Sequence, residues 1–283
     1  MDHIRLSARY LAATPDRHTV SVSRRHPYLA VPGHRAFAHR GWHIDELDGM
    51  ENSLASFRRA SAEGYRFIET DVQVTVDGVV VVHHDSDLER TTDRSGQVSS
   101  LRWSEVSRAR IGGIEPVRRL EDVLEELPEI QFNIDVKSDA AVEPFVRVIE
   151  RTGAIDRIGA AAFSGRRLAR LRRLAGPKLA TAMSPWSVHT LWSESRFRAA
   201  RLGRRITGVM AQVPPGYGRF ALLDERFVRT AHRTGAEVHA WTINTPLQMR
   251  RLLDMGVNGI VTDRPDLLRA VLRERGLWAP PVG

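Results

Sequence analysis

Residues 69–85 read ETDVQVTVDGVVVVHHD, and this stretch decides how the chain is organised. Glu69 and Asp71 stand two apart in a β-branched, apolar run, so on a strand both carboxylates point to the same face. An Asp-Gly pair then separates this run from four valines at 79–82, a pattern that predicts a β-hairpin. The returning arm ends in His-His-Asp at 83–85, which brings the histidines back toward the carboxylates.

Two readings of this stretch are open. Two carboxylates and an imidazole in one small volume are typical of a hard-metal site with an acid or base beside it. The same residues also fit a plain hairpin whose acidic side chains face solvent and whose end is polar. The choice between them depends on what the rest of the chain places nearby.

Apolar runs alternate with helical patterns along the rest of the sequence. We expect strands at 36–38, 67–71, 130–137, 158–163, 179–183, 208–213, 238–243 and 259–262. We expect helices at 54–63, 120–127, 142–152, 166–174, 188–200, 225–234, 246–255 and 265–275, and a further helical stretch at 101–109 within the polar segment 86–119.

The valine run is not a ninth strand of this series. Only seven residues separate Asp71 from Val79, too few for a helical crossover between parallel strands. The sequence therefore predicts an α/β fold, a (β/α)8 TIM barrel with a β-hairpin insertion after strand two. The barrel would span residues 35–276, after an N-terminal extension at 1–34 and before a C-terminal tail at 277–283. Its active site should lie at the carboxyl ends of the strands.

Composition narrows the class of protein. At 283 residues the chain suits a single barrel, and with no cysteine it has neither disulfides nor thiolate metal sites. No apolar run approaches the roughly 20 residues of a membrane helix, and the N-terminus lacks a signal-peptide core, so we expect a cytoplasmic protein without stable membrane insertion. The net charge of +8 suits an anionic substrate.

Of the 42 basic residues only Lys137 and Lys178 are lysines, which draws attention to Lys137.

A third carboxylate belongs with the first two. Asp135 and Lys137 stand two apart at the end of the strand at 130–137, so both point to one face. Three carboxylates in one barrel mouth repel one another unless a divalent cation neutralises them, and oxygen ligands favour Mg²⁺, Ca²⁺ or Mn²⁺. A simple Asp135–Lys137 ion pair is the alternative reading. Trp241 fits either core packing or substrate contact, and we count it among the substrate-binding residues.

The ordered motifs of the chain resemble the glycerophosphodiester phosphodiesterase family, part of the phospholipase C-like phosphodiesterase superfamily of TIM barrels. They are HRG (39–41), EN (51–52), ExD (69–71), VVHHD (81–85), LxRTT (88–92), NIDVK (133–137), WTIN (241–244) and GVNGIVTDRP (256–265). The resemblance runs from about residue 36 to 272 and covers nearly the whole predicted barrel.

The resemblance implies an activity and a set of roles. The family hydrolyses glycerophosphodiesters, such as those of choline and ethanolamine, to glycerol 3-phosphate and an alcohol, with one divalent cation. Here Mg²⁺ or Ca²⁺ is expected, and Mn²⁺ also fits. The expected partner is a small-molecule substrate and not nucleic acid. The implied roles are acid/base catalysis by His39 and His84, phosphate binding by Arg40 and Lys137, metal binding by Glu69, Asp71 and Asp135, and support by Glu51 and Asn52.

Departures from the family pattern leave alternatives open. Asp135 stands where the family has a longer glutamate, so either the metal sits deeper or water fills the gap. Ser53 replaces a threonine and Asn258 an aspartate. A lysophospholipase D or sphingomyelinase D-like enzyme acting on membrane lipids is one alternative, and a non-catalytic phosphate-binding barrel is another. The sequence does not assign acid and base between the histidines, distinguish direct hydrolysis from a cyclic phosphate intermediate, or give the oligomeric state.

Overall fold

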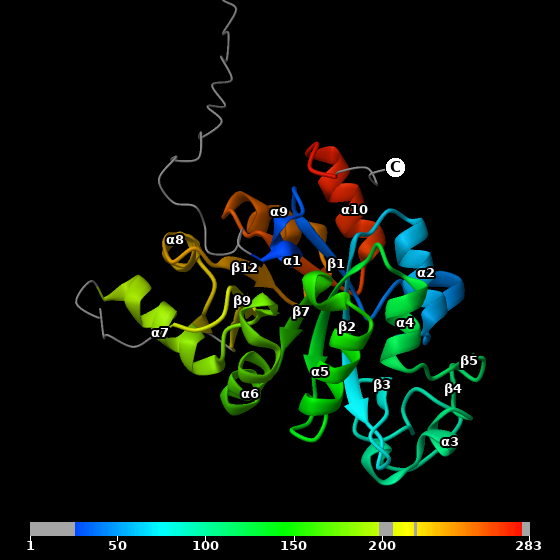
Figure 1. Cartoon of the computed structure of the whole chain (residues 1–283). Helices are drawn as coiled ribbons and strands as arrows, with labels where there is room; N and C mark the ends of the chain where they lie inside the picture. The colour runs from blue at the N-terminus through cyan, green and yellow to red at the C-terminus, as the bar shows by residue number, and fades with distance from the viewer. Residues whose placement is uncertain (1–25, 198–205, 218–219, 279–283) are drawn as a thin grey trace, which may run out of the picture.

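Eight parallel strands form a ring in the computed structural model, which describes residues 26–197, 206–217 and 220–278 (Figure 1). Around the ring the order is β1, β2, β6, β7, β8, β9, β12 and β13, which returns to β1. The strands are β1 (Arg35–His39), β2 (Phe67–Val74), β6 (Gln131–Val136), β7 (Ile158–Ala161), β8 (Ala180–Thr181), β9 (Met210–Val213), β12 (Glu237–Ala240) and β13 (Gly259–Thr262).

The ring closes between β8 and β9. The backbone N–H of Val209 donates to Thr181 O at 2.9 Å, and that of Met183 donates to Met210 O at 2.8 Å. All eight predicted barrel strands are present among the described residues. The predicted (β/α)8 barrel is therefore confirmed.

Helices follow the strands in the predicted alternation. They are α2 (Leu54–Ala62), α4 (Leu120–Glu126), α5 (Val142–Arg151), α6 (Gly165–Ala175), α7 (Pro185–Arg196), α8 (Glu225–Arg233), α9 (Pro246–Asp254) and α10 (Pro265–Glu274). The start of α7 lies three residues before the prediction, because Ser184 caps it through a 3.1 Å bond from Ser187 N and Pro185 occupies the first turn. The predicted end of this helix, at 200, lies outside the described residues.

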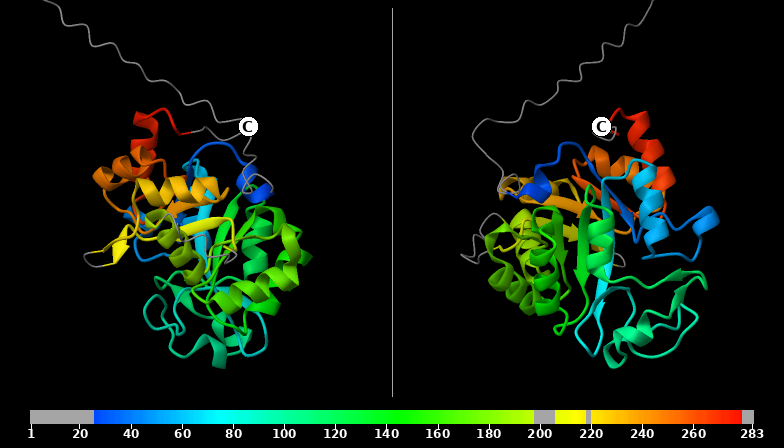
Figure 2. Two further views of the ribbon diagram at one scale, coloured as in Figure 1. Left: turned by 90° about the vertical axis from the view of Figure 1, so that its left-hand side faces the viewer. Right: turned by 45° about the vertical axis from the view of Figure 1, so that its right-hand side comes forward.

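The valine run forms the predicted hairpin. Strand β3 (Val80–Val82) pairs antiparallel with β2, with Val72 opposite Val82 and Val74 opposite Val80. The chain then makes a small lobe, at the end of the barrel away from α10, in which apolar residues form a separate core (Figures 1 and 2). The predicted helix at 101–109 is only the short α3 (Trp103–Val106), and the ribbon of β4 (Arg110–Ile111) and β5 (Glu115–Pro116) was not predicted.

A short helix closes the amino-terminal end of the barrel. In α1 (Pro27–Ala30), Tyr28 and Leu29 are buried and pack against Phe37 and Phe67. A Cβ at Gly159 would lie 2.5 Å from the Tyr28 ring, so glycine is required where this ring enters. Tyr28 and Leu29, which belong to the predicted extension, thus complete the barrel core at this end. The rest of the predicted extension, 1–25, and residues 279–283 of the predicted tail lie outside the described residues.

Polar side chains inside the barrel connect this end to the opposite one. Arg35 pairs with Glu237 at 2.9 Å, and Glu237 lies 3.1 Å from His239 Nε2. His239 Nδ1 is 3.3 Å from Gln212 Nε2, which donates to Asn133 Oδ1 at 2.9 Å. Buried polar groups of this kind are stable only while each finds a partner, so the chain of contacts fixes these side chains.

Among the described residues, no helix has the length and apolarity needed to cross a membrane.

The closure by α1 predicts a large effect on stability. Tyr28→Ala should lower the free energy of unfolding by about 3–5 kcal/mol, because it removes a buried ring that the barrel cannot refill. Tyr28→Phe is the matched control and should change stability little, because the hydroxyl has no hydrogen-bond partner among the described residues. Denaturant titration measures both. Equal midpoints for Tyr28→Ala and the wild type would contradict the closing role of α1.

Candidate active site

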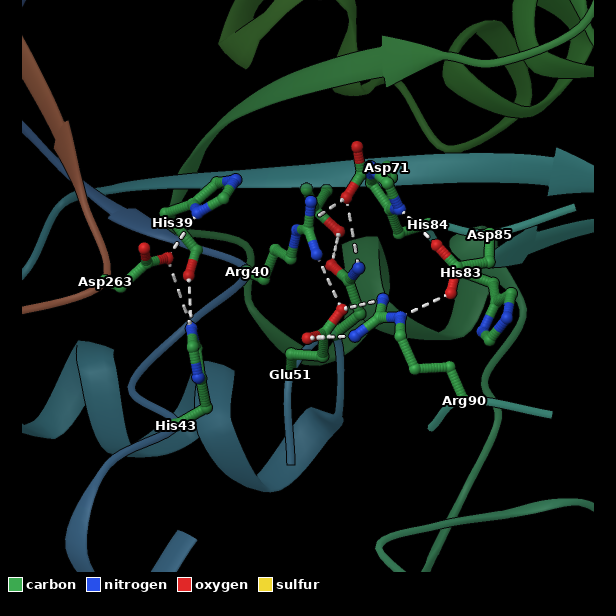
Figure 3. A network of polar contacts seen from close by, with 12 residues as sticks. His39, Arg40, His43, Glu51, Asp71, His83, His84, Asp85, Arg90 and Asp263 are labelled. Carbon is green, nitrogen blue, oxygen red and sulfur yellow. Dashed lines mark hydrogen bonds and ion pairs between the residues drawn. The ribbon is translucent and has the colours of Figure 1, made fainter. Parts of the chain in front are cut away.

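The carboxyl ends of the strands surround a cavity of about 510 Å³. Every residue predicted to act in catalysis, substrate binding or metal binding lines it: His39, Arg40, Glu69, Asp71, His84, Asp135, Lys137 and Trp241. The two predicted supporting residues are not in the lining: Glu51 contacts Arg40 (Figure 3), and Asn52 contacts Asp71.

His39, at the end of β1, is held by a carboxylate from the far end of the chain. Its Nδ1 lies 2.5 Å from Asp263 Oδ1, just after β13 (Figure 3). Burial raises the pKa of Asp263, but hydrogen bonds from His39, His43 and Asn244 outweigh it and hold that pKa well below the usual range. An ionised carboxylate only accepts, so Nδ1 of His39 carries a hydrogen and donates it. The other ring nitrogen, Nε2, is 3.6 Å from Glu69 Oε2 and is left for proton exchange.

His84, at the end of the hairpin, is held in the same way. Its Nδ1 lies 2.5 Å from Asp85 Oδ1. Burial raises the pKa of Asp85, but hydrogen bonds from Arg90 and His84 hold it well below the usual range. His83 points elsewhere, since its Nε2 lies 2.7 Å from Asp87 O and its ring is buried outside the cavity. Of the two neighbouring histidines, only His84 therefore lines the cavity.

Arg40 is aimed into the site by an uncommon backbone conformation. Its φ of 56° lies in the left-handed region, and Gly41 follows with φ 92°. A Cβ at Gly41 would lie 2.3 Å from Ser56 Oγ, so the glycine of HRG is needed for the chain to pass α2. The Arg40 Nη1 donates to Glu51 Oε1 at 2.7 Å, and its Nε lies 3.3 Å from Asp71 Oδ2.

Glu51 and Asn52 position the charged residues in front of them. Glu51 accepts from both Arg40 and Arg90; burial raises its pKa, but these two guanidinium groups lower it to about 2. Asn52 also has a left-handed φ, 58°, a conformation that asparagine tolerates. Its Nδ2 donates to Asp71 Oδ2 at 3.1 Å, and its Oδ1 accepts from Thr70 at 2.7 Å. The N-cap of α2 is Ser53, whose side chain accepts a hydrogen bond from Ser56 N.

The three predicted metal-binding carboxylates lie on two adjacent strands, β2 and β6. Lys137 Nζ lies between two of them, 2.7 Å from Asp71 Oδ1 and 2.8 Å from Asp135 Oδ2. Burial raises the pKa of Asp71, but the charges of Lys137 and Arg40 outweigh it and lower the pKa below its usual value. Glu69 has no such partner, so burial, followed by the charges of Asp71 and Asp135, raises its pKa well above the usual value.

The same carboxylates retain capacity for a cation. Among the described residues no group of three or more His, Cys, Asp or Glu is drawn together tightly enough to enclose a metal ion. Glu69 Oε2 and Asp135 Oδ1 are nevertheless buried without a hydrogen-bond partner. Two unpaired anionic oxygens lining one cavity fit a hard divalent cation, because such ions bind carboxylate oxygen and tolerate water in their remaining positions.

Asp263, Asp85 and Arg90 were not assigned roles from the sequence. The chain Arg90–Glu51–Arg40 joins the small lobe to the barrel, with Arg90 Nε 2.5 Å from Asp85 Oδ2 (Figure 3). Position alone could have placed Asp263 at a strand end, but its contact with His39 spans 224 residues. All three residues belong to motifs quoted above, so the signal was present without a role attached.

The arrangement is suited to phosphate chemistry. Two imidazoles, each oriented by an aspartate, line a cavity that also presents a guanidinium and an ammonium. Cations stabilise the charge that develops on phosphoryl oxygens, and oriented imidazoles exchange protons with attacking and leaving oxygens.

Comparison with known proteins gives a consistent picture. The family model described as "Glycerophosphoryl diester phosphodiesterase family" matches residues 34–267. A Mycobacterium tuberculosis protein named probable glycerophosphodiester phosphodiesterase 2 is 40% identical over 255 residues, which cover 89% of this chain and 95% of that protein. A crystal structure of glycerophosphodiester phosphodiesterase from Agrobacterium tumefaciens has a TM-score of 0.68 at 24% identity and covers 85% of this chain and 99% of its own. An Oleispira antarctica phosphodiesterase, solved in complex with the product sn-glycerol-3-phosphate, has a TM-score of 0.70 at 21% identity, with coverage of 87% and 99%.

Because Glu69 Oε2 has no hydrogen-bond partner among the residues that the structure describes, we expect Glu69→Gln to stabilise the protein by an amount that depends on pH. The pKa of Glu69 is raised in the folded protein. At pH values between the pKa of the unfolded state, about 4.3, and that of the folded state, the native protein therefore binds one more proton than the unfolded chain. Stability therefore falls as pH rises through this window. In EDTA, Glu69→Gln should remove this loss and raise the melting temperature more at pH ~8 than at pH ~4.5.

Glu225→Gln is the matched control, because Glu225 is exposed and pairs with Arg229 on α8. Its melting temperature should follow the wild type at both pH values. A Glu69→Gln protein that is less stable than the wild type at the higher pH would contradict the assigned repulsion.

Proposed function

Because this chain belongs to the glycerophosphoryl diester phosphodiesterase family, we propose that its barrel mouth hydrolyses glycerophosphodiesters to glycerol 3-phosphate and an alcohol. The enzyme is a phosphoric diester hydrolase, and the proposal concerns its substrates and the roles of its residues. Diesters of the glycerophosphocholine and glycerophosphoethanolamine type are the simplest substrates. The sn-glycerol-3-phosphate held by the related Oleispira antarctica enzyme supports this choice of product.

The observation that carries the proposal is the pair of carboxylate-held imidazoles. His39 and His84 come from different elements, β1 and the hairpin, yet line one cavity, and each donates Nδ1–H to an aspartate. Each ring therefore presents Nε2 for proton exchange. In the proposed reaction one imidazole accepts a proton from the attacking oxygen, which belongs either to water or to a hydroxyl of the substrate; in the second case water then opens the cyclic phosphate. The other imidazole donates a proton to the alcohol oxygen as its bond to phosphorus breaks.

Arg40 and Lys137 bind the phosphate in this scheme. Burial lowers the pKa of Lys137, but Asp71 and Asp135 raise it above the usual value for lysine, so Lys137 is charged at neutral pH. Ion pairs with Glu51, Asp71 and Asp135 hold the guanidinium of Arg40 and the ammonium of Lys137 in place before substrate binds. Such preorganised charge is the most effective kind, because it need not move as the transition state forms.

We also propose that Glu69, Asp71 and Asp135 hold one divalent cation, Mg²⁺, Ca²⁺ or Mn²⁺. The two unpaired oxygens, Glu69 Oε2 and Asp135 Oδ1, support this set. When bound, the cation would neutralise negative charge on the phosphoryl oxygens. Asp71 would have to share its carboxylate between the cation and Lys137.

Release of glycerol 3-phosphate from glycerophosphocholine and glycerophosphoethanolamine tests the function. The purified protein should release it with added Mg²⁺, Ca²⁺ or Mn²⁺ and lose at least tenfold in rate after EDTA treatment, with recovery when metal is restored. Unchanged turnover in EDTA would remove the metal from the proposal. Phosphate binding without turnover of either diester under any metal would instead favour a non-catalytic barrel.

The histidine assignment makes a separate prediction. His39→Ala and His84→Ala should each lower kcat by roughly 10²–10⁴, the usual contribution of a general acid or base. His83→Ala is the matched control from the adjacent position and should cost far less, because His83 lies outside the cavity. Steady-state kinetics on glycerophosphocholine measures all three. A crippled His83→Ala beside a mild His84→Ala would reverse the assignment.

A further inference from the structure

The cavity has two chemically different halves. Its acidic and basic side chains, apart from a histidine on α7, come from three neighbouring strands, β1, β2 and β6, and from the end of the hairpin. The opposite arc is built by β7, β8, β9 and β12, the segments that follow them, and α7. The large apolar side chains that this arc contributes are Phe163, Met183, Val188, Trp192, Leu222 and Trp241. Figure 1 shows α7 on the side of the barrel away from the small lobe that carries the end of the hairpin.

The apolar arc runs from a buried floor to an exposed rim. Met183 is buried, whereas Phe163 is 67% exposed and meets Trp241 edge-on at 5.8 Å. At the start of α7, Trp186 is 56% exposed and stacks at 5.5 Å on His189, which lines the cavity. Large exposed aromatic side chains next to a cavity are typical of a surface that an apolar ligand crosses.

A fully polar diester makes poor use of this arc. Glycerol hydroxyls and an ethanolamine ammonium lose water on burial and need hydrogen-bond partners in return. The polar groups nearest to the arc are few: Gln212 already donates to Asn133, and Thr242 and His189 are the others among the described lining residues. A saturated chain has no such requirement and gains from leaving water. The cavity volume of about 510 Å³ also lies within the range, about 300–1,000 Å³, of sites that enclose drug-sized ligands.

We propose that the preferred substrate is a phosphodiester that carries one acyl or alkyl chain, with the phosphate in the charged half and the chain along the apolar arc. The inference rests on the phosphodiesterase function proposed above and specifies the substrate class of that same site. A single-chain lysophospholipid carries this chain on its glycerol. A glycerophospho-alkanol carries it on the leaving alcohol.

Two series of substrates test the inference and distinguish these sources. The first is glycerophosphocholine and its hexanoyl, octanoyl and decanoyl lysophosphatidylcholines, each kept below its micelle-forming concentration. The second is glycerophosphoethanol, glycerophosphohexanol and glycerophospho-octanol. In one series kcat/KM should rise by roughly twofold to fourfold for each methylene buried. The series that rises identifies the side of the phosphate that faces the arc.

The other outcomes separate this inference from the proposed function. Values of kcat/KM that stay flat or fall with chain length in both series, with glycerophosphocholine still hydrolysed, would overturn the inference alone. A higher kcat/KM for choline than for ethanolamine diesters, together with no change in kcat/KM as the chain lengthens, would also overturn the inference. Trp241 and Phe163 would then bind the trimethylammonium group and not an apolar chain. No turnover of any diester, the unacylated one included, would overturn the proposed function and the inference with it.

Variants locate the effect within the molecule. Val188→Asn places an amide in the arc at a half-buried position of α7, so it should flatten the dependence of kcat/KM on chain length. Leu247→Asn makes a similar apolar-to-amide change on α9, at a side chain that is 78% exposed and outside the cavity lining, and should keep the wild-type dependence. An unaltered dependence in Val188→Asn would overturn the assignment of the chain to this arc.

Discussion

The arrangement of the active site depends on how three carboxylates are kept together. Glu69, Asp71 and Asp135 lie on two adjacent strands, so their separation is set by backbone pairing and cannot relax. Lys137 compensates by bridging Asp71 and Asp135, and Arg40 adds a second positive charge beside Asp71. Glu69 Oε2 has no hydrogen-bonded cation in the described part of the chain, and it is here that the site can gain from a further positive charge.

This electrostatic balance explains backbone features that otherwise cost stability. The left-handed conformation at Arg40 is unfavourable for such a side chain by about 1 kcal/mol or more, and the one at Asn52 needs a residue that tolerates it. They place a guanidinium and an amide directly against Asp71. The contacts of Arg40 and Asn52 with Asp71 therefore offset the backbone strain next to the cavity.

Local sequence patterns predicted much of the molecule, and contacts between distant residues account for the rest. Alternating apolar and helical segments gave the barrel, and the short spacing between Asp71 and Val79 identified the hairpin. Side chains two residues apart on a strand point to the same face, and this placed the three carboxylates together with Lys137. In contrast, the Asp263–His39 contact and the entry of Tyr28 beside Gly159 join segments more than 100 residues apart, and no spacing rule applies at that range. The β4–β5 ribbon was missed because strands of two residues leave no periodic signal.

The linked charges from Asp85 through Arg90, Glu51 and Arg40 to Asp71 also have an evolutionary consequence. Replacing any one member leaves the charge of its neighbour unpaired. A single substitution is therefore destabilising, because it removes an ion pair and forms no new one. Change along this path should thus occur as compensated pairs, and effects of single and double substitutions should depart from additivity. In diverging descendants of this chain, these positions would covary, while the apolar arc across the cavity could drift one residue at a time and adapt the enzyme to new ligands.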